Sequence, residues 1–184
     1  KDVSRFEQMK LHMLNGSHSA LTYLGYLAGH ETISDTVADP AFATYVRQLW
    51  AEIMPVVRAP QGFDLQVYAQ ALMERYANPK IRHRTWQIAM DGSQKIPQRW
   101  LATLASQQAE GRRCPSILTA ISGWLCHIRG DNGFVDDPLA EVLKATWAQA
   151  GAHGISAALF RAGGIMASSW TPSEADLLEI ARQL

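Results

Sequence analysis

The sequence predicts an all-α protein, built as one compact domain of roughly eight to ten helices. Apolar residues recur at three- and four-residue intervals along most of the chain, and no stretch alternates apolar and polar residues like a half-buried strand. The chain has 184 residues, of which 47% are hydrophobic and 18% are charged. This length and composition are typical of one globular domain that spans the whole chain. No apolar run approaches the roughly 18 residues that a membrane helix needs, so we expect no membrane segment.

The clearest helices are expected from their apolar spacing and their end signals. The spacing predicts helices over residues 42–57, 65–76, 117–128 and 139–150. Asp39-Pro40 and Asp137-Pro138 each supply a capping carboxylate and a first-turn proline. The last helix is expected to start at Thr171-Pro172-Ser173-Glu174, which has the form of a capping box. Breakers such as Asp91-Gly92 separate the segments, and none is long enough to link two domains.

The overall charge and the cysteines exclude several classes of protein. Lys plus Arg number 17 and Asp plus Glu number 17, a balance that disfavours a dedicated nucleic-acid-binding protein. The two cysteines, Cys114 and Cys126, are too few for a disulfide scaffold and fit a reducing compartment, so we expect a cytoplasmic protein. The six histidines and two cysteines show no metal-ligand spacing, and we expect no metal site.

The positive charge is concentrated in one segment. Residues 80–99 hold five basic side chains and one acidic one, a local charge of +4 in an otherwise acidic chain. Such a cluster focuses an anionic ligand, and arginine suits a carboxylate because its planar fork binds both oxygens. We therefore expect Arg82 and Arg84 to bind substrate. There are two alternatives: several of these basic side chains point to solvent, or they bind the phosphates of a cofactor held by another domain.

The stretch from Met9 to Ser19 places several reactive groups in an apolar context. In an α-helix Asn15 would lie about 140° from Lys10, and His18 about 80°, so that all three share one broad face. Flanking apolar residues would partly desolvate Lys10 and lower its pKa, which would make it a general base. Asn15 would donate a hydrogen bond to an alkoxide, and His18 would contact a substrate hydroxyl. The plainer alternative is a solvated lysine, a helix end at Asn15-Gly16 and a structural histidine.

Two motifs resemble those of a known family. The string Lys10-x4-Asn15-x2-His18 resembles the signature of the polyol-specific long-chain dehydrogenases, which include mannitol 2-dehydrogenases and fructuronate reductases. Residues 78–99, which begin Asn78-Pro79 and contain Asp91-Gly92-Ser93-Gln94-Lys95, resemble the fructuronate reductase branch. Both motifs occur in the family's order.

The resemblance implies roles for individual residues. It makes Lys10 the general base, Asn15 the group that stabilises the reacting oxygen, His18 the residue that orients the substrate, and Lys95 a substrate contact. Mannitol 2-dehydrogenases carry a substrate-binding arginine eight residues before that lysine, where this chain has Gln87. The difference favours a uronate substrate over mannitol.

The resemblance also implies a second domain. In the family an N-terminal Rossmann domain binds NAD, and a helical C-terminal domain carries the lysine. This chain has no Gly-x-Gly-x-x-Gly motif after a strand and no initiator Met, so we expect residues 1–184 to be the C-terminal domain without cofactor-binding residues of its own.

These observations lead to one preferred function and two alternatives. We expect the C-terminal catalytic domain of an NAD-dependent oxidoreductase that interconverts fructuronate and mannonate by hydride transfer, with a sugar acid or polyol and its own Rossmann domain as partners. The first alternative is a mannitol 2-dehydrogenase that interconverts mannitol and fructose. The second is a helical interaction module without catalysis.

Overall fold

The computed structural model describes residues 3–131 and 133–184, and this part of the chain is helical throughout, as predicted. It contains eleven α-helices, two π-helical segments and a 3₁₀ turn, with no strand among the described residues. Two pairs of these α-helices are joined end to end through the π-helical segments, so the described residues form nine separate helices, within the expected eight to ten. Short helices such as α3 (Ile33–Ala38) and α6 (Thr85–Ile88) are too brief to show a period in the sequence. No helix of this part is long and apolar enough to span a membrane.

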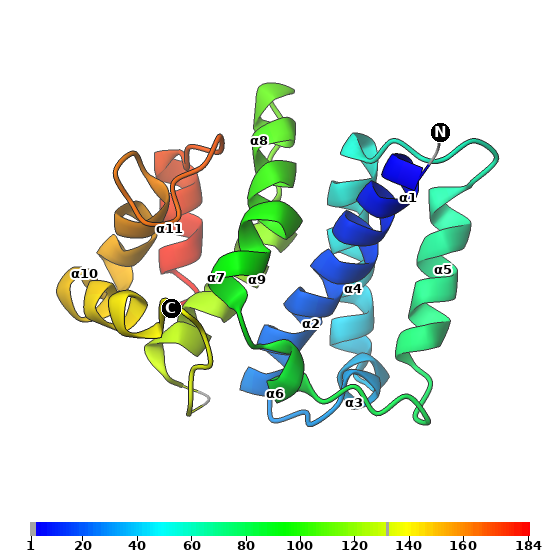
Figure 1. Cartoon of the computed structure of the whole chain (residues 1–184), viewed down its shortest axis with the longest axis horizontal. Coiled ribbons are helices and arrows are strands. Elements are labelled where there is room, and N and C mark those ends of the chain that lie inside the picture. The colour runs from blue at the N-terminus through cyan, green and yellow to red at the C-terminus, as the bar shows by residue number, and fades with distance from the viewer. Residues whose placement is uncertain (1–2, 132) are drawn as a thin grey trace.

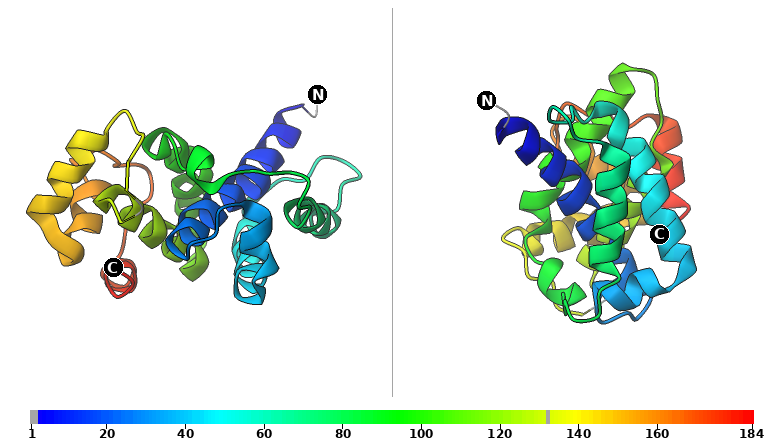
Figure 2. Two further views of the ribbon diagram at one scale, coloured as in Figure 1. Left: turned by 90° about the horizontal axis from the view of Figure 1, so that it is seen from below. Right: turned by 90° about the vertical axis from the view of Figure 1, so that its right-hand side faces the viewer.

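Two long helices carry the regions of interest, and each is interrupted by a π-helical segment. The first runs through α1 (Val3–Met9), η1 (Lys10–Asn15) and α2 (Gly16–Leu27), drawn in blue in Figure 1. The views in Figure 2 show its N-terminal end projecting from the body, in agreement with the exposure of residues 3–8.

The second long helix runs through α7 (Gly92–Ile96), η3 (Pro97–Leu101) and α8 (Ala102–Ala109). Pro97 explains its π-segment. Proline lacks the N–H that would bond to the carbonyl four residues back, so it interrupts the α-helical pattern where η3 begins. Within η3 the Ala102 N–H donates to the Pro97 carbonyl, five residues back. The segments η1 and η3 lie in contact with one another.

Helix α9 (Pro115–Arg129) is the centre of the core. Every residue from Ser116 to Ile128 except Thr119 is buried, which is the pattern of a helix covered on all sides. It packs against α2, and it lies between the half of the molecule that holds α2 and α4 (Pro40–Ile53) and the half that holds α10 and α11 (Figure 1). The 3₁₀ turn η2 (Met54–Val56) and α5 (Leu65–Tyr76) follow α4.

Most of the predicted helix ends are correct, and one is not. Asp39 caps α4 through the Ala41 N–H at 2.9 Å, and Asp137 accepts from the Leu139 N–H at 2.9 Å before α10 (Ala140–Phe160). The last helix, α11 (Glu174–Ala181), begins two residues later than expected, because its capping box is formed by Ser173 and Asp176.

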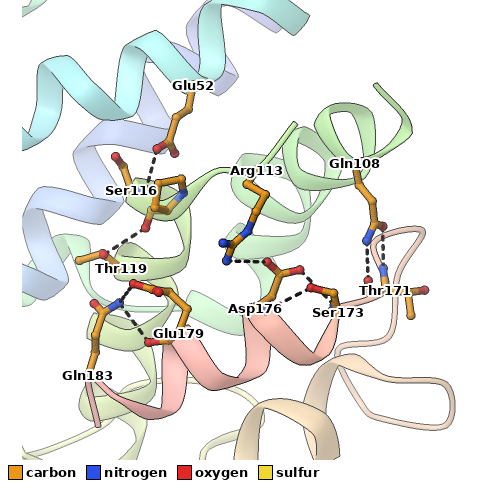
Figure 3. A network of polar contacts seen from close by, with 11 residues as sticks. Glu52, Gln108, Arg113, Ser116, Thr119, Thr171, Ser173, Asp176, Glu179 and Gln183 are labelled. Carbon is orange, nitrogen blue, oxygen red and sulfur yellow. Dashed lines mark hydrogen bonds and ion pairs between the residues drawn. The ribbon is translucent and has the colours of Figure 1, made fainter. Parts of the chain in front are cut away.

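Polar side chains connect α4, α9 and α11 (Figure 3). The Glu52 carboxylate caps the start of α9 by accepting the Ser116 N–H at 2.8 Å and the Ile117 N–H at 3.0 Å. The Arg113 guanidinium lies 3.6 Å from Asp176 at the start of α11. These contacts join α4 to α9 and fix the start of α11.

Candidate active site

Lys10 opens the η1 segment and is exposed to solvent. Met9 and Met13, four residues apart, turn into the core with exposed fractions of 3% and 0%, whereas the side chain of Lys10 is exposed. The expectation that its apolar neighbours partly bury the amine is therefore wrong for this chain. The amine makes no ion pair or hydrogen bond with a described residue, so it is free to meet a ligand.

The π-helical geometry changes the relation between Lys10 and Asn15. In an α-helix, residues five apart diverge by about 140°, as the sequence analysis assumed. In η1 the hydrogen bonds join residues five apart, as in the bond from the Gly16 N–H to the Leu11 carbonyl, so residues i and i+5 lie one turn apart. Lys10 and Asn15 therefore lie on the same face. Gly16 continues into α2 without the break that the Asn-Gly pair allowed.

Four consecutive carbonyls at the end of η1 accept hydrogen bonds from side chains of other elements. The donors and their acceptor carbonyls are Trp50 Nε1 to Met13 (3.0 Å), the Tyr76 hydroxyl to Leu14 (2.9 Å), Arg99 Nη1 to Asn15 (3.4 Å) and Trp100 Nε1 to Gly16 (3.0 Å). A helix that changes between two hydrogen-bonding patterns needs such donors, because buried carbonyls without partners are costly. The tertiary packing thus holds the π-segment in place.

His18, one turn after Asn15, is enclosed by aromatic rings. Its ring stacks on Tyr76 with centroids 5.6 Å apart and meets His83 edge-on at 5.1 Å. Its Nε2 is buried and has no hydrogen-bond partner among the described residues. Burial, followed by the nearby charges of His83, Arg99, Arg75 and Lys95, lowers the pKa of His18 to about 3. His18 is therefore a neutral imidazole at ordinary pH.

Lys95 lies on α7, which starts from a strained turn. Asp91 adopts a left-handed backbone with φ of 57°. Asp137 holds the next turn by accepting the Ser93 N–H at 2.7 Å and the Ser93 hydroxyl at 2.6 Å. The Lys95 amine donates to the Met90 carbonyl at 2.5 Å and the Ile88 carbonyl at 3.4 Å. Burial, followed by the nearby Arg99, lowers the pKa of Lys95.

Arg82 and Arg84 do not join this group. The segment around them is extended and pairs with the chain near Thr32, so successive side chains point to opposite sides. His83 faces His18, whereas Arg82 and Arg84 line a separate pocket of about 440 Å³ beside the exposed Trp86. Trp86 is 49% exposed.

Arg99 is the residue that the sequence analysis did not single out. It lies four residues after Lys95, on the next turn of the same long helix, and its guanidinium reaches Ser19 Oγ at 2.6 Å as well as the Asn15 carbonyl. Its spacing from Lys95 was the available signal. The structure therefore brings Asn15, His18, Lys95 and Arg99 together, and the exposed Lys10 lies one turn before Asn15 in η1.

The described residues do not fit a dinucleotide site. They contain no strand that leads through a glycine-rich turn into a helix, the arrangement that holds the pyrophosphate of NAD. Within the same residues, no three His, Cys, Asp or Glu side chains are grouped so that they could hold a metal ion. What the site does offer is a set of free polar groups on η1 and α2, namely the Lys10 amine, the Asn15 amide and His18 Nε2.

Known proteins share both the sequence and the fold of this chain. A sequence profile of the mannitol dehydrogenase C-terminal domain matches residues 2–166. D-mannonate oxidoreductase of Escherichia coli (strain K12) is 45% identical over 96% of this chain and 37% of its own length. A mannitol 2-dehydrogenase of Aspergillus fumigatus is 36% identical over 78% of this chain and 30% of its own length.

A solved structure agrees with these sequence matches. The Pseudomonas fluorescens mannitol 2-dehydrogenase, in ternary complex with NAD and D-mannitol, matches with a TM-score of 0.89 and 30% identity, over 100% of this chain and 38% of that one. The chain thus spans about a third of the length of the relatives it matches, 37% and 30% for the two named above. It belongs to the mannitol dehydrogenase family, whose C-terminal domain it represents.

Proposed function

We propose that this chain is the substrate-binding and catalytic domain of an NAD-dependent dehydrogenase that interconverts a keto-hexuronate and its hexonate, D-fructuronate and D-mannonate. One observation carries the proposal. The Lys10 amine, the Asn15 amide and His18 Nε2 have no partner among the described residues, although four hydrogen bonds from other elements hold their segment in place. A rigid segment with free donors and acceptors is suited to bind a polar substrate.

The choice of a hexonate rests on charge and on similarity. Lys95 and Arg99 lie beside His18 without an ion-pair partner among the described residues, which favours a substrate that carries a carboxylate. The 45% identity to a D-mannonate oxidoreductase points the same way. The absence of arginine at position 87 removes a contact that the resemblance gives to mannitol enzymes.

In the proposed reaction Lys10 accepts the proton of the substrate hydroxyl. The Asn15 amide donates a hydrogen bond to the same oxygen, and neutral His18 orients a neighbouring hydroxyl. NAD, bound mainly by a second domain, supplies the hydride chemistry when present. Because Lys10 is exposed here, a covering domain that excludes water would favour the neutral, proton-accepting amine. Lys95 is assigned a substrate contact, and Arg82 and Arg84 are kept as the anion-binding residues of the neighbouring pocket.

The proposal also places the enzyme in the cytoplasm, where Cys114 and Cys126, both buried and free, would stay reduced. A mannitol 2-dehydrogenase is the second candidate, favoured by the TM-score of 0.89 against such an enzyme. A non-catalytic module has lost its support, because the chain belongs to a family of dehydrogenases.

The substrate is tested by steady-state kinetics of the full-length enzyme that contains this chain. We expect D-fructuronate and D-mannonate to have far higher kcat/KM than D-fructose and D-mannitol. Their KM should rise with added salt, since ions screen an exposed attraction between charges. Equal efficiency on fructose and fructuronate would reject the hexuronate and return the mannitol reaction to first place.

A further inference from the structure

Arg99 is held at one edge and free at the other. Its Nη1 donates to Ser19 Oγ at 2.6 Å and to the Asn15 carbonyl at 3.4 Å. Its Nε and Nη2 make no hydrogen bond with the described residues, and no carboxylate of that part of the chain lies within ion-pair distance. The side chain is half-buried, so the guanidinium is positioned by the fold and still accessible.

The surroundings of Arg99 are positive, and no carboxylate of the described residues forms an ion pair with Arg99 or Lys95. Lys95 lies near it on the same long helix, and His18 feels the charges of Arg99, Lys95 and Arg75. Two carboxylates, Asp91 and Asp137, act on Lys95 from beyond ion-pair distance, and Asp137 already accepts hydrogen bonds from Ser93 and the Leu139 N–H. Burial lowers the pKa of Arg99, which shows that its charge is partly withdrawn from water.

Cations that are partly desolvated and unpaired destabilise a fold unless an anion joins them. A carboxylate matches the free edge of a guanidinium, because two parallel N–H groups meet its two oxygens. Lys95 is less suited to this role, since its amine is already directed at two main-chain carbonyls. Arg82 and Arg84 face the other side of the extended segment.

We propose that Arg99 is the specificity-determining residue of this site and binds the substrate carboxylate through its Nε and Nη2 edge, with Ser19 holding the opposite edge. The inference rests on the proposed function and adds to it the group that distinguishes a hexonate from a polyol. In that arrangement Lys10 and Arg99 act on opposite ends of the six-carbon substrate, the reacting hydroxyl and the carboxylate.

The test is a comparison of Arg99→Gln with wild type in the full-length enzyme, on D-mannonate and D-mannitol. We expect Arg99→Gln to lower kcat/KM for D-mannonate by about 30-fold or more, mainly through KM, as for a partly buried charge that loses its partner. The value for D-mannitol should change by less than about threefold, within the effect of one neutral hydrogen bond. Arg182→Gln, on an exposed arginine at the end of α11, is the matched control and should leave both values unchanged.

Two further variants keep the test decisive if Arg99→Gln folds poorly. Arg99→Lys retains the charge without the fork and should still lose D-mannonate selectively. Ser19→Ala frees the held edge and should raise KM for D-mannonate more than for D-mannitol.

An equal loss on both substrates would mean that Arg99 only supports the η1 carbonyls, and unchanged kinetics would mean that it has no role; either result overturns the inference and leaves the proposed function standing. A wild-type enzyme without activity on D-mannonate or D-fructuronate would instead overturn the proposed function, and this inference with it.

Discussion

Gly92, at the start of α7, should not tolerate a methyl group. A Cβ at this position would lie 2.4 Å from Trp124 Nε1 and 2.6 Å from the Tyr23 hydroxyl oxygen. Both rings are fully buried, and the Tyr23 hydroxyl is engaged with the Ala89 carbonyl at 3.0 Å. A methyl group would therefore force these buried rings or α7, which carries Lys95, to shift.

The cost of Gly92→Ala follows from these contacts. Overpacking of this kind destabilises by about 1–3 kcal/mol, and a disturbed Tyr23 hydrogen bond adds about 1 kcal/mol. The gain from alanine in a helix offsets about 0.5–1 kcal/mol. We therefore expect a net loss of about 2 kcal/mol in the free energy of unfolding, measured by urea denaturation of the 184-residue chain.

Gly16→Ala is the matched control for this measurement. A Cβ at Gly16 would meet its nearest atoms at 3.5, 3.8 and 3.9 Å, which are ordinary van der Waals contacts. Gly16 is also helical, so we expect its replacement to be neutral or to stabilise by up to about 1 kcal/mol. If the free energy of unfolding of Gly92→Ala equals that of wild type, or equals that of Gly16→Ala, the steric argument is refuted.

Three other predictions test the site. Tyr76→Phe removes the hydroxyl that donates to the Leu14 carbonyl, and should lower the free energy of unfolding by about 1–3 kcal/mol in urea denaturation; an unchanged midpoint would exclude a role in holding η1. Because the pKa of His18 is lowered to about 3, its ring resonances should not titrate between pH 8 and 5 in NMR spectra, and a midpoint near 6.5 would contradict its burial. The unfolded chain does protonate this ring below about pH 6.5, so His18 should make stability fall as pH falls toward 3. Asn15→Ala should lower the rate of the chemical step by about 10²–10³-fold, and a pure loss of substrate affinity would assign Asn15 to binding.

The helical architecture could be predicted from the sequence because it depends on local patterns. The apolar spacing located α4, α5 and α9, and Asp39 caps its helix as expected. The kink at Gly151, where φ is 63°, agrees with the expected helix end near residue 150. Such signals need no knowledge of the rest of the chain.

The π-segments could not be predicted in this way, because tertiary contacts decide them. The carbonyls of η1 are satisfied by Trp50, Tyr76, Arg99 and Trp100, which come from other parts of the sequence. The sequence alone therefore predicts an α-helical period from Lys10 to Asn15, whereas the structure is π-helical there. The contact of η1 with η3 brings the two sequence motifs together in space.

The basic segment shows the same limit. Its charge was correctly seen as uneven, but charge counting does not tell which side chains share a face. The extended backbone around His83 turns Arg82 and Arg84 away from His18, whereas the helix that follows brings Lys95 and Arg99 toward it. Arg99 is one of the five basic residues of this segment, but the charge of the segment does not distinguish it from the other four.

The most direct test of the account is whether Lys10 is the base of the reaction. In the full-length enzyme that contains this chain, Lys10→Ala should lower turnover by about 10²–10⁴-fold, the range for a lost general base. Small primary amines added to the assay should restore part of the rate, because a free amine can take the place of the deleted side chain and accept the proton. Turnover near that of wild type in Lys10→Ala would contradict the account.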